Sequence, residues 1–287
     1  MRRIGILTSG GDCQALNATM RGVAKSLYNM LDDVEIIGFE DGYKGLMYAD
    51  YQIMKPADFS GILTQGGTIL GTSRQPFKQM RLPDENGLDK VEAMKHTYKK
   101  LKLSCLVVLG GNGSQKTANM LSEEGLNVVS LPKTIDNDLW GTDMTFGFQS
   151  AVDVATNAID CISKEDAAMS KKELKEKKKS GVVYPSVAYE IGARIQEVTG
   201  SEVRVTVPGH MQRGGEPCPY DRVLATRLGA AAAELIINEE YGYMAAVKNN
   251  EITKVPLSEV AGKLKTVDPD CSMIREAKRI GISFGDE

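Results

Sequence analysis

Short apolar runs that end in glycine, each followed by a helical pattern of apolar residues, recur through the first half of the chain. The runs predict strands at 3–11, 34–42, 105–114 and 126–138. Helical spacing follows at 15–30, 91–102, 116–125 and 149–162. Strands that alternate with helices indicate an α/β fold with a mostly parallel sheet. Ligands of such sheets bind beyond the carboxyl ends of the strands, so the loops there are the candidates for chemistry.

The second half reads differently. A dense mixed-charge stretch at 163–181 predicts a solvated helix or mobile segment. Its acidic residues and its lack of aromatic residues argue against nucleic-acid binding. Helical spacing then returns at 186–200 and 221–238, and between them 202–215 predicts a strand that enters a basic, glycine-rich loop.

Composition limits the partners. The chain has 287 residues, of which 42% are hydrophobic and 25% charged, and its net charge is -3. Such a balance gives no general attraction to nucleic acid or to anionic membranes, so a small ligand is expected. The five cysteines are scattered and favour reduced thiols in the cytoplasm over disulfides or a zinc site. The N-terminal residues resemble no secretory leader, and no apolar run approaches membrane-spanning length.

Three glycine-rich segments, at 8–17, 66–77 and 110–114, are candidate phosphate sites. Glycine lets backbone N–H groups approach a phosphate, above all where a helix begins. Arg74 adds a fixed cation and Ser114 a hydroxyl. None of these loops matches the dinucleotide fingerprint or the P-loop, which argues against a dinucleotide oxidoreductase. Taken alone, each fits a tight turn equally well.

The segment "PKTIDND", at 132–138, is more specific. Alternation along an extended chain would point Thr134, Asp136 and Asp138 to one side. One carboxylate of such a pair can accept a proton while the other orients a metal ion. The alternative is an acidic turn with side-chain to backbone bonds. Further along, His210 and Arg213 follow a predicted strand and suit a phosphate.

Several motifs in order resemble the 6-phosphofructokinase family, which includes ATP-dependent and pyrophosphate-dependent members. They are "LTSGGDCQALNA", "GGTILGTSR", "GGNGS", "PKTIDND", "TFGFQSAVD" and "GHMQRGGEPCPYDR". The resemblance implies two three-layer α/β domains with the active site between them. Residues 1–150 would bind the phosphoryl donor and residues 151–287 the sugar phosphate. It also implies a cytoplasmic, glycolytic homo-oligomer, either a dimer or a tetramer.

The resemblance implies roles for individual residues in Mg²⁺-dependent transfer to the 1-hydroxyl of fructose 6-phosphate. Asp136 would be the base, with Thr134 beside it and Asp138 assisting the metal. The remaining assignments follow from matching positions. Donor-binding residues would be Gly11, Arg74, Gln75, Gly111, Asn112, Gly113, Ser114 and Lys133. Sugar-phosphate residues would be Thr134, Ile135, Asp136, His210 and Arg213, with Arg204 from a neighbouring subunit.

Three positions bear on the metal and the donor. Asn112 stands where the family more often has aspartate, a Mg²⁺ ligand, and the amide keeps an oxygen but loses the charge, which weakens the metal site. Gly113 leaves room for a nucleotide, whereas Lys133 is usual in pyrophosphate users. A carboxylate at position 113 would repel the nucleotide, and such a repulsive group excludes a ligand more effectively than one extra cation recruits it. Because Gly113 carries no such group, we expect ATP, with pyrophosphate as the alternative.

The resemblance also implies that a block is absent at the junction of Ile162 and Ser163. There the family carries on the order of seventy residues that line the sugar site, too many for a trimmed loop. Either a segment is missing from this sequence or the chain is a deleted variant. We favour the first, because losing central strands would expose strand edges and apolar helix faces. A catalytically silent protein that binds nucleotide or sugar phosphate is the alternative function.

Overall fold

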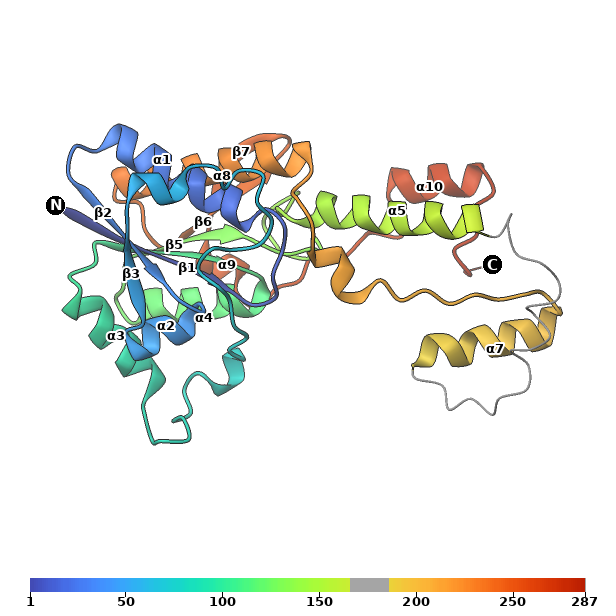
Figure 1. Ribbon diagram of the computed structural model, residues 1–287, viewed down its shortest axis with the longest axis horizontal. Coiled ribbons are helices and arrows are strands. Elements are labelled where there is room, and N and C mark those ends of the chain that lie inside the picture. Colours follow the sequence, from blue (N-terminus) through green and yellow to red (C-terminus); the bar gives the residue numbers. More distant parts are fainter. Residues whose placement is uncertain (166–185, 287) are drawn as a thin grey trace.

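The computed structural model describes residues 1–165 and 186–286, with side chains from 1–161 and 186–286. Its centre is a seven-stranded sheet in the order β3-β2-β1-β4-β5-β6-β7 (Figure 1). The strands are β1 (Arg2–Ser9), β2 (Val34–Phe39), β3 (Tyr51–Met54), β4 (Cys105–Gly110), β5 (Val128–Pro132), β6 (Tyr243–Lys248) and β7 (Glu251–Pro256). Only β3 and β7, at the two edges, run antiparallel to their neighbours. The predicted α/β class with a mostly parallel sheet is confirmed.

Helices cover both faces of this sheet (Figure 1). One face carries α1 (Leu16–Met30) and α8 (Pro219–Ile237), whose buried residues belong to one core cluster. The other carries α2 (Tyr43–Tyr48), α3 (Lys90–Lys100), α4 (Asn112–Glu123) and α9 (Leu257–Val260), which contribute to a second cluster. Strands β1 and β4 supply residues to both clusters because alternate side chains point to opposite faces.

The remaining described elements are short 3₁₀ turns and three further helices. The turns are η1 (Pro56–Phe59), η2 (Phe77–Gln79) and η4 (Gly209–Arg213). The helices are α5 (Phe148–Glu165), α7 (Val187–Thr199) and α10 (Ser272–Arg279). The mixed-charge stretch predicted at 163–181 lies outside the described residues, except for its first three. None of the helices described is long and apolar enough to cross a membrane, and all five cysteines are free.

Helices α1 and α8 approach closely because glycines face each other at their contact. A methyl group added at Gly229 would lie 2.6 Å from the Thr19 carbonyl oxygen and 2.7 Å from the Val23 nitrogen. A methyl at Gly22 would lie 2.9 Å from the Thr226 carbonyl oxygen. Backbone atoms cannot move aside without separating the helices, so the contact tolerates no larger residue.

We therefore expect Gly229→Ala to lower the free energy of unfolding by roughly 1–3 kcal/mol through overpacking. Urea denaturation measures the loss. The matched control is Gly113→Ala, because a methyl there meets no atom within 4 Å and alanine is the better helix former. Equal stabilities of the two variants would contradict a tight helix contact.

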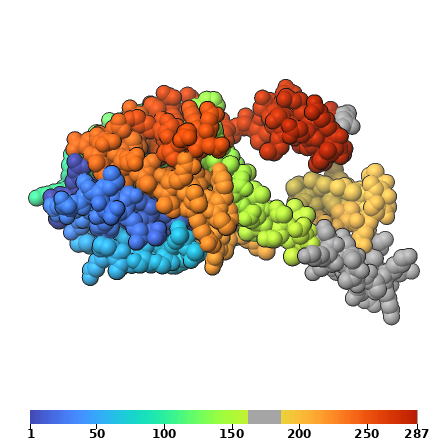
Figure 2. Space-filling model, turned by 90° about the horizontal axis from the view of Figure 1, so that it is seen from above, coloured from blue at the N-terminus to red at the C-terminus, as the bar shows by residue number. Residues whose placement is uncertain are grey.

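Residues 202–208 show where the sequence prediction of a strand is wrong. They contain no regular secondary structure and pair with none of the seven strands. A strand needs a hydrogen-bonded neighbour, and the described residues offer none beside this segment. The two core clusters also take no buried residue from the described residues between 152 and 223. In Figure 2, α7 and α10 accordingly stand apart from the main mass.

The sheet crosses the boundary predicted at residue 150. Strands β6 and β7 and helix α8, all from the predicted second domain, complete the sheet and one of its helical layers. Exposed apolar side chains remain on α7, where Val187 is 69% and Val198 85% exposed. Strands from both sides of residue 150 therefore belong to the same sheet.

Candidate active site

Three adjacent parallel strands bring the predicted loops together. Strands β1, β4 and β5 are neighbours in the sheet, and their carboxyl ends meet at one edge. Gly10 and Gly11 follow β1, Gly111 follows β4, and Lys133 follows β5. These loops enclose a cavity of about 330 Å³. The cavity lies where ligands bind to open α/β sheets.

Twelve of the fifteen predicted site residues line this cavity. They are Gly11, Arg74, Gln75, Gly111, Asn112, Gly113, Ser114, Lys133, Thr134, Asp136, Asp138 and Arg213. Four further residues line it that the sequence analysis had not assigned: Ser9, Gly10, Pro76 and Phe77. All four lie within two residues of Gly11 or Gln75 and inside the candidate phosphate segments 8–17 and 66–77, so their place in the chain is the signal that could have found them.

The other three predicted residues lie elsewhere. Ile135 packs against the core cluster beneath α1 and α8. His210 is exposed in η4, and Arg204 pairs with Glu202 at 3.1 Å between Nε and Oε1. Both belong to the part of the chain that has no described sheet around it. The structure therefore brings the donor loops and the acids together, and it leaves these three side chains outside the cavity.

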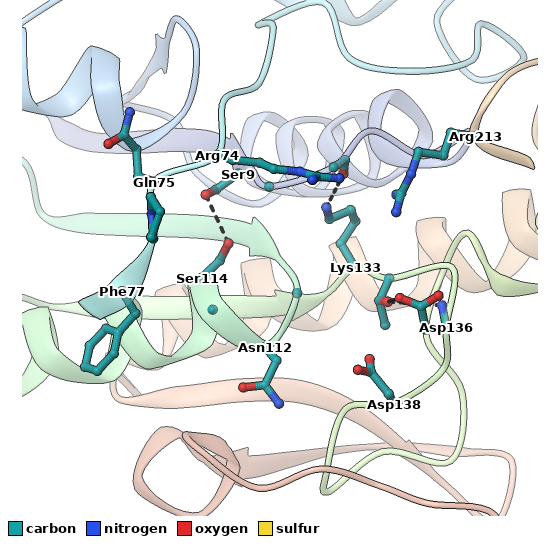
Figure 3. Close-up of a pocket in the computed structure, with 16 residues that line it drawn as sticks. Ser9, Arg74, Gln75, Phe77, Asn112, Ser114, Lys133, Asp136, Asp138 and Arg213 are labelled. Carbon is teal, nitrogen blue, oxygen red and sulfur yellow. Dashed lines mark hydrogen bonds between the residues drawn. The ribbon is translucent and has the colours of Figure 1, made fainter. Parts of the chain in front are cut away.

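Figure 3 shows the charges of the cavity on two sides. Arg74, Lys133 and Arg213 lie along one side, and Asp136 and Asp138 lie opposite. Such an arrangement can hold an anion against the cations while carboxylates face its other end. Charge-assisted hydrogen bonds of this kind are the strongest that side chains offer to phosphate.

Arg213 enters the cavity because Gly11 makes room for it. A methyl group at Gly11 would lie 2.7 Å from Nη1 of Arg213. The same Nη1 donates to the Asp12 carbonyl oxygen at 2.8 Å. Buried Gln14 secures the loop around Arg213 by donating to the carbonyl oxygens of Gln212 at 2.9 Å and Gly214 at 3.0 Å. Residues about 200 positions apart in the chain thus share one wall of the cavity.

Lys133 is a buried cation on the same side of the cavity as Arg74 and Arg213. Only 3% of its surface is exposed, and its Nζ donates to the Gly11 carbonyl oxygen. Burial lowers the pKa of its ammonium below the ordinary value, and the nearby charges of Arg213 and Arg74 act in the same direction. The negative charge of a bound anion would stabilise this ammonium. Lys133 is therefore suited to bind a phosphate.

The segment "GGNGS" joins β4 directly to α4 and is not a separate loop: Gly110 ends the strand, and Asn112, Gly113 and Ser114 form the first turn of the helix. Helix α4 begins at Asn112, four residues earlier than the pattern at 116–125 predicts. The backbone N–H groups of a first helical turn have no partner within the helix. Asn112, Gly113 and Ser114 line the cavity, so the positive end of the helix lies at the anion site. The Ser114 hydroxyl is 3.0 Å from that of Ser9.

The two acids reach the cavity by a turn, not by the extended alternation predicted from sequence. Asn137 has a φ of 50°, in the left-handed region, so the chain bends between Asp136 and Asp138. The Thr134 hydroxyl accepts from the Asp136 N–H at 3.1 Å and lies 3.4 Å from Asp136 Oδ2. The Asx and ST geometry of the alternative interpretation is therefore present, yet all three side chains still line the cavity.

Asp138 and Asn112 are the oxygen-bearing residues that suit a divalent cation. Oδ1 of Asp138 is buried and has no hydrogen-bond partner, which leaves a carboxylate oxygen open for a ligand. Asn112 uses its amide N–H to donate to the Lys263 carbonyl oxygen at 3.0 Å, so its own oxygen remains available. Within the described ranges no three His, Cys, Asp or Glu side chains cluster as a metal site. This donor set fits Mg²⁺, which keeps several waters and takes other ligands from phosphates.

A second cavity, of about 640 Å³, adjoins the first. Pro76, Phe77 and Gly113 line both cavities. The second cavity extends over η2 and α4 towards Ala261 and Gly262, and Arg81, Lys116 and Met120 also line it. It offers an aromatic ring, an apolar side chain and cations next to the anion site, which together suit a planar, charged ligand group.

Comparison with known proteins gives consistent results. A family model described as phosphofructokinase matches residues 3–176 and 171–236. An ATP-dependent 6-phosphofructokinase of Spirochaeta thermophila is 45% identical over 364 residues, covering 99% of this chain and 98% of that protein. ATP-dependent 6-phosphofructokinase 3 of Bacteroides thetaiotaomicron is 40% identical, covering 99% of this chain and 100% of that protein.

The length of the first alignment bears on the predicted missing block. It runs over 364 positions, whereas this chain has 287 residues, so at least 77 positions have no residue of this chain opposite them. This number is similar to the length of the expected block, and its place at the junction of Ile162 and Ser163 stays a prediction.

Solved structures share the fold. A pyrophosphate-dependent phosphofructokinase from Marinobacter aquaeolei superimposes with a TM-score of 0.76 at 16% identity, covering 94% of this chain and 86% of that chain. Phosphofructokinase from Pichia pastoris gives a TM-score of 0.75 at 24% identity. There the match covers 90% of this chain but only 35% of the larger chain.

Proposed function

Because the chain belongs to the phosphofructokinase family, we propose that it transfers the terminal phosphoryl group of ATP to the 1-hydroxyl of fructose 6-phosphate. The observation that carries the proposal is the cavity in which a helix N-terminus and three cations face Asp136 and Asp138. Phosphoryl transfer needs little covalent chemistry from the protein beyond positioning and charge stabilisation.

Asp136 is the proposed base. Its carboxylate takes the proton of the 1-hydroxyl as that oxygen bonds to the terminal phosphorus, and the bond to the bridging oxygen breaks to release ADP. The Thr134 hydroxyl, 3.4 Å from Asp136 Oδ2, keeps the carboxylate in place. Lys133 and Arg74 neutralise charge on the donor side of the cavity.

Mg²⁺ is the proposed cofactor, with Asp138 and Asn112 as the residues that would hold it. When bound, Mg²⁺ neutralises charge on the donor phosphates and orients the terminal group. The unpartnered Oδ1 of Asp138 supports this assignment. The amide at Asn112 supplies an oxygen without a charge, so we expect weaker metal binding than an aspartate there would give.

ATP is the proposed donor, with pyrophosphate as the alternative. The cavity beyond Gly113 supports ATP, because pyrophosphate would leave that volume unused. Lys133, which lines the cavity, favours pyrophosphate. Product formation in the presence of Mg²⁺, measured with each donor in turn, decides between them. We expect turnover with ATP, and turnover with pyrophosphate alone would reverse the assignment.

The acceptor side is proposed to include Arg213, which would hold the 6-phosphate of the sugar from the cavity wall. His210 and Arg204 lie outside the cavity of their own chain, and we propose that Arg204 serves a neighbouring subunit of a cytoplasmic homo-oligomer. Sedimentation velocity tests the last point: dimers or tetramers support it, and a monomer at all concentrations contradicts it.

The second candidate function is a protein that binds nucleotide without turnover. One observation favours it: the described residues from 201 to 210, which include two predicted sugar-phosphate residues, have no sheet around them. ATP binding by calorimetry together with no product from fructose 6-phosphate would favour the silent protein. Product formation would exclude it.

A substitution of Lys133 should weaken ATP binding without lowering the stability of the fold without ligand. We expect Lys133→Met to weaken ATP binding roughly tenfold to a hundredfold, the value of a hydrogen bond to a charged group. The fold without ligand should be no less stable, since a buried cation is replaced by an apolar side chain of similar length. Calorimetric titration and thermal unfolding measure the two effects.

The pH dependence of the same variant is a further check. The folded pKa of Lys133 lies below the ordinary value of 10.5, so between these two values the unfolded chain binds the extra proton. Wild-type stability relative to Lys133→Met should therefore rise as the pH rises through this window. A relative stability that falls with pH would mean that the ammonium is stabilised by its surroundings.

A further inference from the structure

Residues 262–265, which we call the strap, connect the two walls of the active site. They follow α9 and reach both the first turn of α4 and the loop that carries the two acids. The carbonyl oxygen of Lys263 accepts from the Asn112 side-chain amide at 3.0 Å. Leu264 forms an antiparallel bridge with Leu139, and the backbone N–H of Lys265 donates to the Asp138 carbonyl oxygen at 2.9 Å.

The side chain of Lys265 is the strongest attachment of the strap. Its Nζ donates to Asn137 Oδ1 at 3.0 Å, to the Thr142 carbonyl oxygen at 3.0 Å and to the Asp143 carbonyl oxygen at 2.9 Å. An ammonium has three donors, so all of them are used on one loop. None of these contacts lies within the cavity itself, and Lys265 does not line it.

Asn137 transmits this attachment to the acids. It lies between Asp136 and Asp138, and its left-handed φ of 50° sets the directions in which the two carboxylates point. Its Oδ1 accepts from the Thr145 N–H at 3.0 Å as well as from Lys265. Because the side chain is held from two sides, the bend in the backbone is held as well.

We propose that the strap is a positioning element of the metal site: it holds Asn112 and Asp138 at a fixed separation, and Lys265 acts as a positioning residue through Asn137. The inference rests on the proposed function, which makes those two residues the metal ligands. It also explains what the amide at Asn112 contributes. An aspartate there would place a carboxylate oxygen against the Lys263 carbonyl oxygen, two acceptors without a proton between them.

Trp140 reports on the strap directly. It is the only tryptophan of the chain, it follows Leu139 in the loop, and it is 45% exposed. Nζ of Lys263, on the strap, lies 5.8 Å from the centre of its ring. Release of the loop from the strap should therefore change the accessibility of this one indole, whether or not any ligand is bound.

The test compares Lys265→Met and Asn137→Gly, singly and together, with Lys248→Met as the control. Asn137→Gly tolerates the left-handed backbone and removes only the side chain. Lys248 is exposed at the end of β6. Two quantities are measured: acrylamide quenching of Trp140 without ligand, and the Mg²⁺ concentration needed for ATP binding.

We expect each single variant to raise the quenching constant at least about twofold and the required Mg²⁺ concentration on the order of tenfold, as supporting contacts of metal ligands do. The double variant should change both quantities by less than the combined effect of the two single variants, because both single variants remove the bond between Lys265 and Asn137. Quenching and Mg²⁺ dependence that match wild type and Lys248→Met would overturn the proposal.

The outcomes separate the strap from the proposed function. If Lys265→Met does not fold, Asn137→Gly gives the same comparison. If wild type binds no ATP at any Mg²⁺ concentration, the proposed function fails, and the quenching of Trp140 still decides whether Lys265 holds the loop.

Discussion

Asp136→Asn should lower kcat for fructose 6-phosphate phosphorylation by a factor on the order of 10²–10⁴, the usual contribution of a general base. The amide is of the same size and can still face the Thr134 hydroxyl, so the cavity keeps its shape. It cannot take the proton of the attacking hydroxyl. Since Asp136 is not proposed to contact the nucleotide, the KM for ATP should stay within a small factor of wild type.

Asp143→Asn is the matched control for this substitution. Asp143 belongs to the same loop, but it does not line the cavity. Its Oδ2 accepts from the Asn249 N–H at 2.7 Å, and an asparagine oxygen can accept the same bond. We expect near wild-type kcat for Asp143→Asn. Equal losses in the two variants would mean that the loop as a whole, and not the Asp136 carboxylate, carries the effect.

Gly113→Asp should weaken ATP binding on the order of a hundredfold. A Cβ atom added at Gly113 meets no atom within 4 Å, and Gly113 lines both cavities, so the carboxylate can enter the space where they adjoin. Like charges about 4 Å apart repel by roughly 4 kcal/mol at an effective dielectric constant near 20, part of which the helix N-terminus offsets. Donor preference should shift towards pyrophosphate, which does not extend past Gly113.

Stability separates this effect from misfolding. An acidic residue in the first turn of α4 interacts favourably with the helix dipole, so thermal unfolding should occur at an unchanged or higher temperature. Gly113→Asn is the control, because it adds nearly the same volume without charge. If both variants bind ATP equally weakly, the size of the added side chain blocks the space where the two cavities adjoin, and the argument from charge repulsion is wrong.

The sequence predicted those helices and strands in which buried and exposed residues alternate with a regular period. Helix α1, with one buried face, begins one residue from its prediction and ends where predicted. Strands β6 and β7 were missed, and β7 is a largely exposed edge strand. The order of charged and apolar residues in β7 does not distinguish this strand from a polar loop.

The start of α4 was missed for a related reason. Asn112 and Gly113 are poor helix formers, and the pattern of apolar residues begins only after them. The N-terminus is stabilised instead by tertiary contacts, such as the bond from the Tyr43 hydroxyl to the Ser114 carbonyl oxygen at 2.9 Å. Contacts between residues 71 positions apart leave no local signal in the sequence.

The candidate site was largely predictable because motif residues follow strands, and strand ends in a parallel sheet converge. The bend at Asn137 was not predictable from alternation, since it depends on bonds from Thr145 and Lys265. The strand predicted from residue 202 is wrong for the opposite reason. The pattern of residues 202–208 is typical of a strand, but the neighbouring strands that it requires are not among the described residues.

The central claim is that ATP bound at the α4 N-terminus gives its terminal phosphoryl group to a sugar hydroxyl beside Asp136. The most direct test follows ATP and fructose 6-phosphate by phosphorus NMR, with Mg²⁺ and the full chain present. We predict the appearance of ADP and fructose 1,6-bisphosphate in equal amounts, with no product from Asp136→Asn on the same timescale. ATP that binds but remains intact, or that yields ADP and free phosphate without sugar bisphosphate, would contradict the account.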